Sequence, residues 1–168
     1  MRLEETGDAA IPLPDPRGSI VVGHDGSAGS DHALAAALGL AEHLNLPVVV
    51  VRAWSIATAP RPSTWSFGYV PSFQEYSDAV HGELVRDSGA IAGDYFGLQV
   101  SYHAVHAHPV RTLIALSRDA RMLVVGSRGK GALAGMLLGS VSEKCARHAA
   151  CPVLIVPAPL YPAPEQRP

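Results

Sequence analysis

Apolar runs of strand length alternate along the chain with segments whose apolar residues recur at helical spacing. The runs are rich in β-branched and aliphatic residues and have the length of buried strands. The expected strands are 19–22, 48–53, 98–105, 122–125 and 153–156. The expected helices are 27–44, 72–95, 110–117 and 140–147, and either Ser27 or Ser30 can cap the first of them. This alternation predicts an α/β protein.

Strands that alternate with helices form a parallel sheet with right-handed crossovers and helices on both faces. The expected fold is therefore Rossmann-like, a five-stranded parallel sheet in the order 3-2-1-4-5 with strands numbered along the chain. Such sheets bind ligands at the carboxyl ends of the strands, where the strand order reverses. The turn after residues 19–22 and the loop after residues 122–125 should meet there, although about a hundred residues separate them.

A glycine-rich stretch follows the fourth expected strand. Its residues of interest are Gly126, Gly129, Gly131, Gly135 and Gly139, followed by the hydroxyls of Ser140 and Ser142. Glycine lets backbone amides approach a phosphate, and the start of the next helix adds unpaired N–H groups and a positive dipole end. Neither a Walker pattern nor an unbroken G-x-G-x-x-G fingerprint is present. The stretch therefore indicates an anion site of another type.

The spacing of this stretch, G-x2-G-x9-G-S, is carried by Gly126, Gly129, Gly139 and Ser140. It resembles the nucleotide-binding loop of the universal stress protein family, in the branch that binds ATP. The resemblance extends over residues 19–157, which is nearly the whole of the expected domain. It implies the version of the Rossmann-like fold found in adenine nucleotide alpha hydrolases. It also implies ATP, with or without Mg²⁺, as the ligand.

The resemblance assigns residues to the site by their position. The Asp25 carboxylate would lie near the adenosine, where it can accept hydrogen bonds from ribose hydroxyls or the adenine amine. Ala53 would contact the adenine edge through its backbone. The full set implied for the nucleotide is Gly23, Asp25, Ala53, Val125, Gly126, Arg128, Gly129, Gly139, Ser140, Val141 and Ser142, with no catalytic residue and no metal ligand. Simpler roles stay open, because Asp25 and the two serines also suit helix capping.

The resemblance implies nucleotide-dependent regulation as the function. The protein would bind ATP, change the order of a loop and thereby alter its association with an unidentified regulatory protein. The last expected strand, 153–156, is short, apolar and bounded by prolines, and in the family such an edge strand forms the homodimer contact.

Two alternatives remain: a slow ATPase, and an interaction module of the same fold that binds no nucleotide. The intact glycine spacing argues against the second. Against the first, no water-activating carboxylate is evident beside Ser140 and no Walker lysine is present. ATP hydrolysis is therefore expected to be weak or absent.

Composition narrows the expected partners and compartment. The 168 residues carry a net charge of −2 without a strong basic field, so nucleic acid is not an expected partner. The apolar runs are too short to cross a bilayer, and the first residues lack the apolar core of a secretory signal. Cys145 and Cys151 are too few for a disulfide framework and are expected to fill the core. The cytoplasm is the expected compartment.

Some segments are less determined by their pattern. Residues 54–71 are rich in proline and aromatic side chains and either fold over a ligand or form a surface insert. Residues 1–17 and 159–168 are expected to be a flexible leader and tail around a single domain at 18–158.

Four histidines, three near the end of the third expected strand and one after the first, raise the question of a metal site or a catalytic dyad. His103, His106 and His108 cluster near the end of the third expected strand, but Pro109 interrupts their regular spacing. No metal site is expected there, because no further set of ligands with recognised spacing accompanies them. His24 is adjacent to Asp25, and neighbouring residues of a strand point to opposite faces, so a catalytic dyad of this pair is not expected.

Overall fold

Strands and helices alternate from end to end of the computed structural model, which describes residues 12–158. The strands are β1 (Ile20–Gly23), β2 (Val48–Trp54), β3 (Val100–His106), β4 (Met122–Gly126) and β5 (Val153–Val156). The helices are α1 (Ala28–Leu44), α2 (Phe73–Ala92), α3 (Pro109–Leu116) and α4 (Ser140–His148). All strand pairs are parallel and the order is β3-β2-β1-β4-β5, so the predicted fold class and topology are confirmed.

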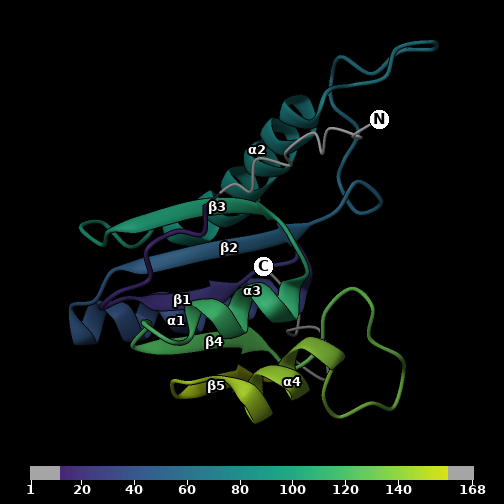
Figure 1. Ribbon diagram of the computed structural model, residues 1–168. Coiled ribbons are helices and arrows are strands. Elements are labelled where there is room, and N and C mark those ends of the chain that lie inside the picture. Colours follow the sequence, from purple (N-terminus) through teal and green to yellow (C-terminus); the bar gives the residue numbers. More distant parts are fainter. Residues whose placement is uncertain (1–11, 159–168) are drawn as a thin grey trace, which may run out of the picture.

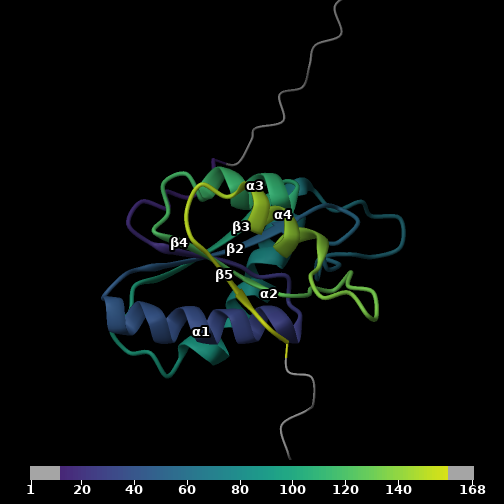
Figure 2. The same ribbon diagram turned by 90° about the horizontal axis from the view of Figure 1, so that it is seen from below.

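Helices cover both faces of the sheet, α1 and α2 on one and α3 and α4 on the other (Figures 1 and 2). Successive side chains of β1 point to opposite faces of the sheet, so this strand contributes to the core on both sides. Ile20 and Val22 pack in the core under α1, whereas Val21 packs in the core under α3 and α4. A central strand buried on both faces needs apolar residues at every position, and this requirement produces the continuous apolar runs of the sequence.

The ends of several elements differ from the prediction by one to three residues. β2 continues through Trp54, which was expected to begin the following loop. Trp54 pairs with His106 at the end of β3, is buried, and stacks on Phe73 with ring centroids 5.3 Å apart. Helix α2 ends at Ala92, with Gly93 as its C-cap, three residues earlier than expected.

The neighbouring strands β1 and β4 end at the same edge of the sheet, with Val22 in register with Val124. The segments that follow β2 and β4 both leave the sheet at this edge (Figure 1). The two distant turns therefore come together as the topology required. Most of the expected leader and all of the expected tail lie outside the described residues. No helix within 12–158 combines the length and apolar character needed to cross a bilayer.

Candidate functional site

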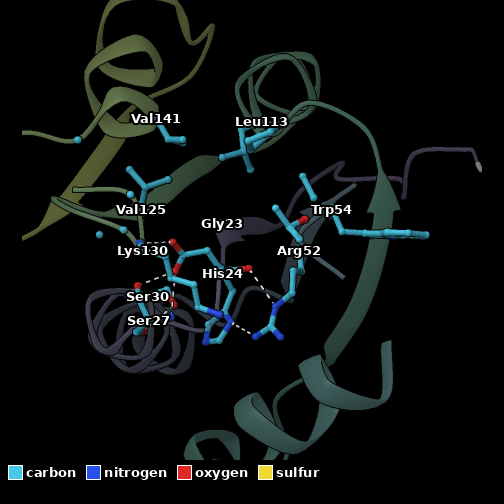
Figure 3. Close-up of a pocket in the computed structure, with 18 of the residues that line it drawn as sticks. Gly23, His24, Ser27, Ser30, Arg52, Trp54, Leu113, Val125, Lys130 and Val141 are labelled. Atoms are coloured by element: carbon cyan, nitrogen blue, oxygen red, sulfur yellow. Dashed lines mark hydrogen bonds between the residues drawn. The ribbon is translucent and has the colours of Figure 1, made fainter. Parts of the chain in front are cut away.

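A cavity of about 860 Å³ opens at the carboxyl edge of the sheet, between the turn after β1 and the loop that joins β4 to α4 (Figure 3). This volume is within the range of small-molecule sites. All the candidate residues line it: Gly23, Asp25, Ala53, Val125, Gly126, Arg128, Gly129, Gly139, Ser140, Val141 and Ser142. The structure thus brings the whole predicted set to one place.

One hydrogen bond joins the two turns directly. The backbone N–H of Lys130 donates to Oδ2 of Asp25 at 2.9 Å, across 105 positions of sequence. A Cβ on Gly129 would collide with the same carboxylate oxygen. Glycine at this position therefore allows the loop to approach the Asp25 carboxylate closely enough for the bond to form.

The other oxygen of Asp25 organises its own turn. It accepts from the Ser27 N–H at 3.0 Å and from the Ser27 hydroxyl, an Asx-type turn. The helix cap itself is Ser27, whose Oγ accepts from the Ser30 N–H at 3.2 Å. Burial raises the pKa of Asp25, but the hydrogen bonds from Ser27 and Lys130 outweigh it and hold the pKa below its usual value. An ionised carboxylate with remaining acceptor capacity lies at the cavity.

Glycines also allow the loop after β4 to lie against the first turn of α1. A Cβ on Gly126 would lie 2.8 Å from the Gly29 carbonyl oxygen, and a Cβ on Gly29 would lie 2.6 Å from the Arg128 carbonyl oxygen. Contacts this short with backbone atoms leave no room for a side chain at either position. The spacing of glycines therefore has a packing reason in addition to any ligand.

At the far end of the loop, the backbone closes on itself before α4 begins. The N–H of Gly139, the N-cap residue, donates to the Ser127 carbonyl at 2.7 Å. The buried Ser142 hydroxyl donates to the carbonyls of Ser127, at 2.8 Å, and Gly139, at 3.0 Å. Ser142 is thus engaged within the protein, whereas Ser140 is exposed at the cavity. Of the two hydroxyls, the Ser140 one is free to meet a ligand.

Sequence reasoning found Asp25 and Arg128 but missed a second group of charged or titratable residues at the cavity. Arg52 and His24 are buried and line it together with Glu83 of α2. The Arg52 guanidinium donates to Glu83 at 3.2 Å and to Asp87 at 2.9 Å. A signal was present in the sequence, since Arg52 is the one charge in the apolar run of β2.

An aromatic cluster adjoins the cavity on the β2 and β3 side. The His106 ring lies 4.7 Å from Trp54 and 5.1 Å from Phe73, measured between ring centroids. His106 thus packs as an aromatic side chain, whereas His103 bonds the Ser101 hydroxyl at 3.0 Å. Among the described residues, no group of three or more acidic, histidine or cysteine side chains is placed to hold a metal ion.

The segment after β2 reaches the cavity, and the two cysteines differ in burial. Ser55, Thr58 and Pro60 line the cavity, so part of the aromatic and proline-rich segment borders it. Cys145 is fully buried in the core, as expected, whereas Cys151 is partly exposed. Burial raises the pKa of the Cys145 thiol to about 11.

The sequence of this chain also matches a family of known proteins. The model of the universal stress protein family matches residues 16–157. Universal stress protein Rv2623 of Mycobacterium tuberculosis is 34% identical over 151 residues, which cover 88% of this chain and 48% of that protein. The chain spans about half the length of the curated relatives it matches.

Solved structures agree with the fold and include nucleotide complexes. A universal stress protein in complex with cAMP is 29% identical with a TM-score of 0.61, over 84% of this chain and 97% of that one. A family member from Arabidopsis thaliana with AMP bound has a TM-score of 0.59 over 88% of this chain and 96% of that one. At 17% identity the second likeness concerns the fold alone. Both neighbours hold adenine nucleotides.

Proposed function

Because this chain belongs to the universal stress protein family, we propose that it binds an adenine nucleotide, in the first place ATP, in the cavity at the carboxyl edge of its sheet. The observation that carries the proposal is the hydrogen bond from Lys130 to Asp25, which joins two distant turns beside that cavity. A site assembled from both turns can contact the two ends of a nucleotide at once. The nucleotide complexes of relatives support the adenine class.

The adenosine would occupy the half of the cavity that borders β1, β2 and β4. The Asp25 carboxylate would accept from ribose hydroxyls, since it is ionised and keeps acceptor capacity. Gly23 and Ala53 would present backbone atoms to the nucleoside, and the buried Val125 would give it an apolar wall.

The phosphates would occupy the half bounded by the glycine loop and α4. Gly126, Gly129 and Gly139 carry no side chain that would keep phosphates away from the backbone, and the start of α4 contributes N–H groups and a positive dipole end. The Gly139 amide itself is engaged by the Ser127 carbonyl, so this residue would act by leaving space. In addition to the glycines, this half would use Arg128, Ser140, Val141 and Ser142. Arg128 would pair with phosphate oxygens, and Ser142 would act through its backbone, because its hydroxyl bonds Ser127 and Gly139.

If Mg²⁺ accompanies ATP, the phosphates and the Ser140 hydroxyl fit an ion that prefers oxygen ligands. The ion would offset phosphate charge. The protein has no cluster of carboxylates around Ser140 for this task within the described residues. For the same reason we expect ATP hydrolysis to be weak or absent. A phosphate-release assay that gives several turnovers per second would overturn this expectation, whereas slower but measurable release would favour the alternative, a slow ATPase.

The biological role would be regulatory, in the cytoplasm and as a homodimer, with ATP altering contact with a protein partner. Strand β5 is the proposed dimer edge. It pairs with β4, and all four of its side chains are partly exposed. Such an edge is a template for a further strand.

Identification of the bound nucleotide tests the proposal most directly. Protein purified without added nucleotide is heated, and the released molecules are identified by mass spectrometry. Calorimetry then compares ATP, AMP and GTP. We expect an adenine nucleotide in the first measurement and tighter binding of ATP than of GTP in the second.

Two matched glycine variants serve as controls. A Cβ at Gly139 would meet backbone atoms no closer than 3.5 Å, and a Cβ at Gly131 would meet nothing within 4 Å, so both alanine variants should fold. Gly139→Ala places a methyl beside the Ser127–Gly129 backbone, where phosphates would lie, and should weaken ATP binding by about tenfold or more. Gly131→Ala should bind as the wild type does. A wild type without measurable ATP affinity would instead support the module that binds no nucleotide.

The homodimer has its own test. The carbonyls of Pro152 and Val156 accept from β4 at 2.9 and 2.8 Å. Alternation along a parallel strand then directs the backbone of Ile155 toward the open edge. Ile155→Pro should remove a donor there and yield a monomer in size-exclusion chromatography. A wild type that is already monomeric at micromolar concentration would contradict the proposal.

A further inference from the structure

A network of polar contacts lies beneath the turn that follows β1 and carries Asp25 (Figure 3). The His24 imidazole contacts Asp31 through Nε2 at 2.9 Å and Arg52 through Nδ1 at 2.7 Å. The Arg52 guanidinium continues to Glu83 and Asp87 on α2. The His24 side chain is fully buried and that of Arg52 is 6% exposed. This network of polar contacts thus connects α1, β1, β2 and α2.

Two donors determine the tautomer of His24. Its Nδ1 faces the Arg52 guanidinium, which is cationic and can only donate, and the Gly26 N–H at 3.3 Å. Nδ1 must therefore accept, so the ring proton lies on Nε2 and is donated to Asp31. A second proton, on Nδ1, would face a cation and an N–H donor, and both contacts would be lost.

The same contacts hold the backbone on both sides of Asp25. Nε of Arg52 donates to the His24 carbonyl at 3.3 Å, and the Gly26 amide donates to the His24 ring. Gly26 has φ +82°, a conformation that favours glycine. The direction of the Asp25 carboxylate therefore depends on the His24–Arg52 pair.

We propose that His24 and Arg52 are positioning residues that set the Asp25 turn for nucleotide binding, and that protonation of His24 at Nδ1 releases this turn and lowers the affinity. The inference rests on the proposed function for its ligand. Neither side chain needs to touch the nucleotide, because both act through Asp25. Acidification would thus favour the nucleotide-free state.

Charged groups of both signs lie around the His24 ring. Some of them contact the ring itself, and others contact Arg52. The groups on the packed elements are Asp25, Asp31, Arg52, Glu83, Asp87 and Lys130. Burial lowers the pKa of His24 and the Arg52 charge adds to this, whereas the Asp31 hydrogen bond raises it. The net direction is below the ordinary value of 6.5. His24 is accordingly neutral at neutral pH and becomes charged only in acid.

The experiment compares ATP affinity of wild type and His24→Asn at about pH 7.5 and about pH 5 by calorimetry. An asparagine amide lies where Nδ1 lies, can accept from Arg52 through its oxygen and does not titrate. We expect similar affinities at the higher pH. At the lower pH the wild type should lose more affinity than the variant does, by at most about tenfold for each pH unit below the pKa of His24. The loss of affinity in the wild type is divided by the loss in the variant, because the ATP phosphate groups titrate in the same pH range and change the affinity of both proteins.

His24→Gln is the contrasting variant. Its amide extends toward Asp31 and leaves Arg52 without the ring acceptor, so ATP binding should be weaker at both pH values. Equal pH profiles for wild type and His24→Asn would overturn the proposal. So would equal affinities for His24→Gln and wild type at neutral pH.

Nitrogen-15 NMR of the ring provides a readout that needs no nucleotide and no variant. We expect His24 to show a protonated Nε2 and a bare Nδ1 at neutral pH, and the Gly26 amide resonance to shift when Nδ1 gains its proton. A protonated Nδ1 at neutral pH, or an unmoved Gly26 amide, would refute the proposal even if ATP binds. If ATP does not bind while the NMR results hold, the proposed function fails but the switch in the turn stands.

Discussion

The two turns that meet at the cavity are built in contrasting ways. The turn after β1 rests on side chains: His24 and Arg52 lie beneath it and are buried. The loop between β4 and α4 has mainly backbone contacts, and in its middle Leu133 and Leu137 are 70% and 87% exposed. The middle of this loop carries two turn hydrogen bonds of its own, Ala132 to Gly129 and Met136 to Leu133.

The contrast shows which half of the site is set before a ligand arrives. Side-chain bonds from Arg52 of β2, which is itself held by Glu83 and Asp87 of α2, fix the Asp25 turn, so its acceptor is already oriented. The loop is fixed at its two ends, near Gly126 and Gly139, while its middle projects from the protein (Figure 1). Substitutions should therefore cost stability in the first turn and at the ends of the loop, and little in the loop's middle.

The largest effect is expected for Arg52→Met. The change leaves His24 without its donor and removes the partner of Glu83 and Asp87, which are partly exposed. Loss of one member of a buried charged network costs about 3 kcal/mol of unfolding free energy. Urea denaturation measures it. Arg17→Met is the control, because Arg17 pairs with Asp15 on the surface and should cost much less. Equal losses in the two variants would remove the basis of the comparison.

A smaller loss of stability is expected for Gly126→Ala. The new Cβ would lie 2.8 Å from the Gly29 carbonyl oxygen, so β4 and α1 must separate at a cost of about 2 kcal/mol. Thermal or urea unfolding checks it against Gly131→Ala, where a Cβ meets nothing within 4 Å and stability should hold. A stable Gly126→Ala protein would show that the glycine at this end of the loop serves a ligand and not the packing.

The pH dependence of stability gives the next effect. Burial lowers the pKa of His24 in the folded protein, while the unfolded chain keeps a value near 6.5. As the pH is lowered below 6.5, the unfolded chain therefore binds the proton before the folded protein does. The free energy of unfolding decreases with this acidification until the pH lies below the pKa of His24 in the folded protein. The slope from this one group is at most about 1.4 kcal/mol per pH unit. In His24→Asn that contribution should vanish; urea midpoints that fall equally with acid in both proteins would assign it elsewhere.

The smallest effect concerns the cysteines, which lie away from both turns. The pKa of Cys145 is raised to about 11 and its side chain is fully buried, so little thiolate forms near neutral pH. Iodoacetamide should modify Cys151 before Cys145 in the native protein, and peptide mass spectrometry distinguishes them. Faster labelling of Cys145 would mean that α4, beside the loop, opens readily.

Local patterns sufficed for much of the fold, and a local motif led to the candidate residues through a family resemblance. The central strands are buried on both faces, so each leaves an apolar run that can be recognised, and the alternation with helices limits the topology. The spacing of Gly126, Gly129 and Gly139 is local as well. It resembles the loop of the universal stress protein family, and that resemblance implied a set of residues that the structure gathers around one cavity.

Interactions between distant residues were decided only by the tertiary structure. Asp31 and Arg52 reach the His24 ring from two elements, and Asp87 reaches Arg52 from a third. No spacing in the sequence predicts that arrangement. The extension of β2 through Trp54 likewise depends on pairing with β3 and stacking on α2. The periodicity of apolar residues indicates which face of an element is buried, because buried positions recur once per turn of a helix and at every second residue of a strand. A buried charge is stabilised by particular partners, and folding alone brings those partners together.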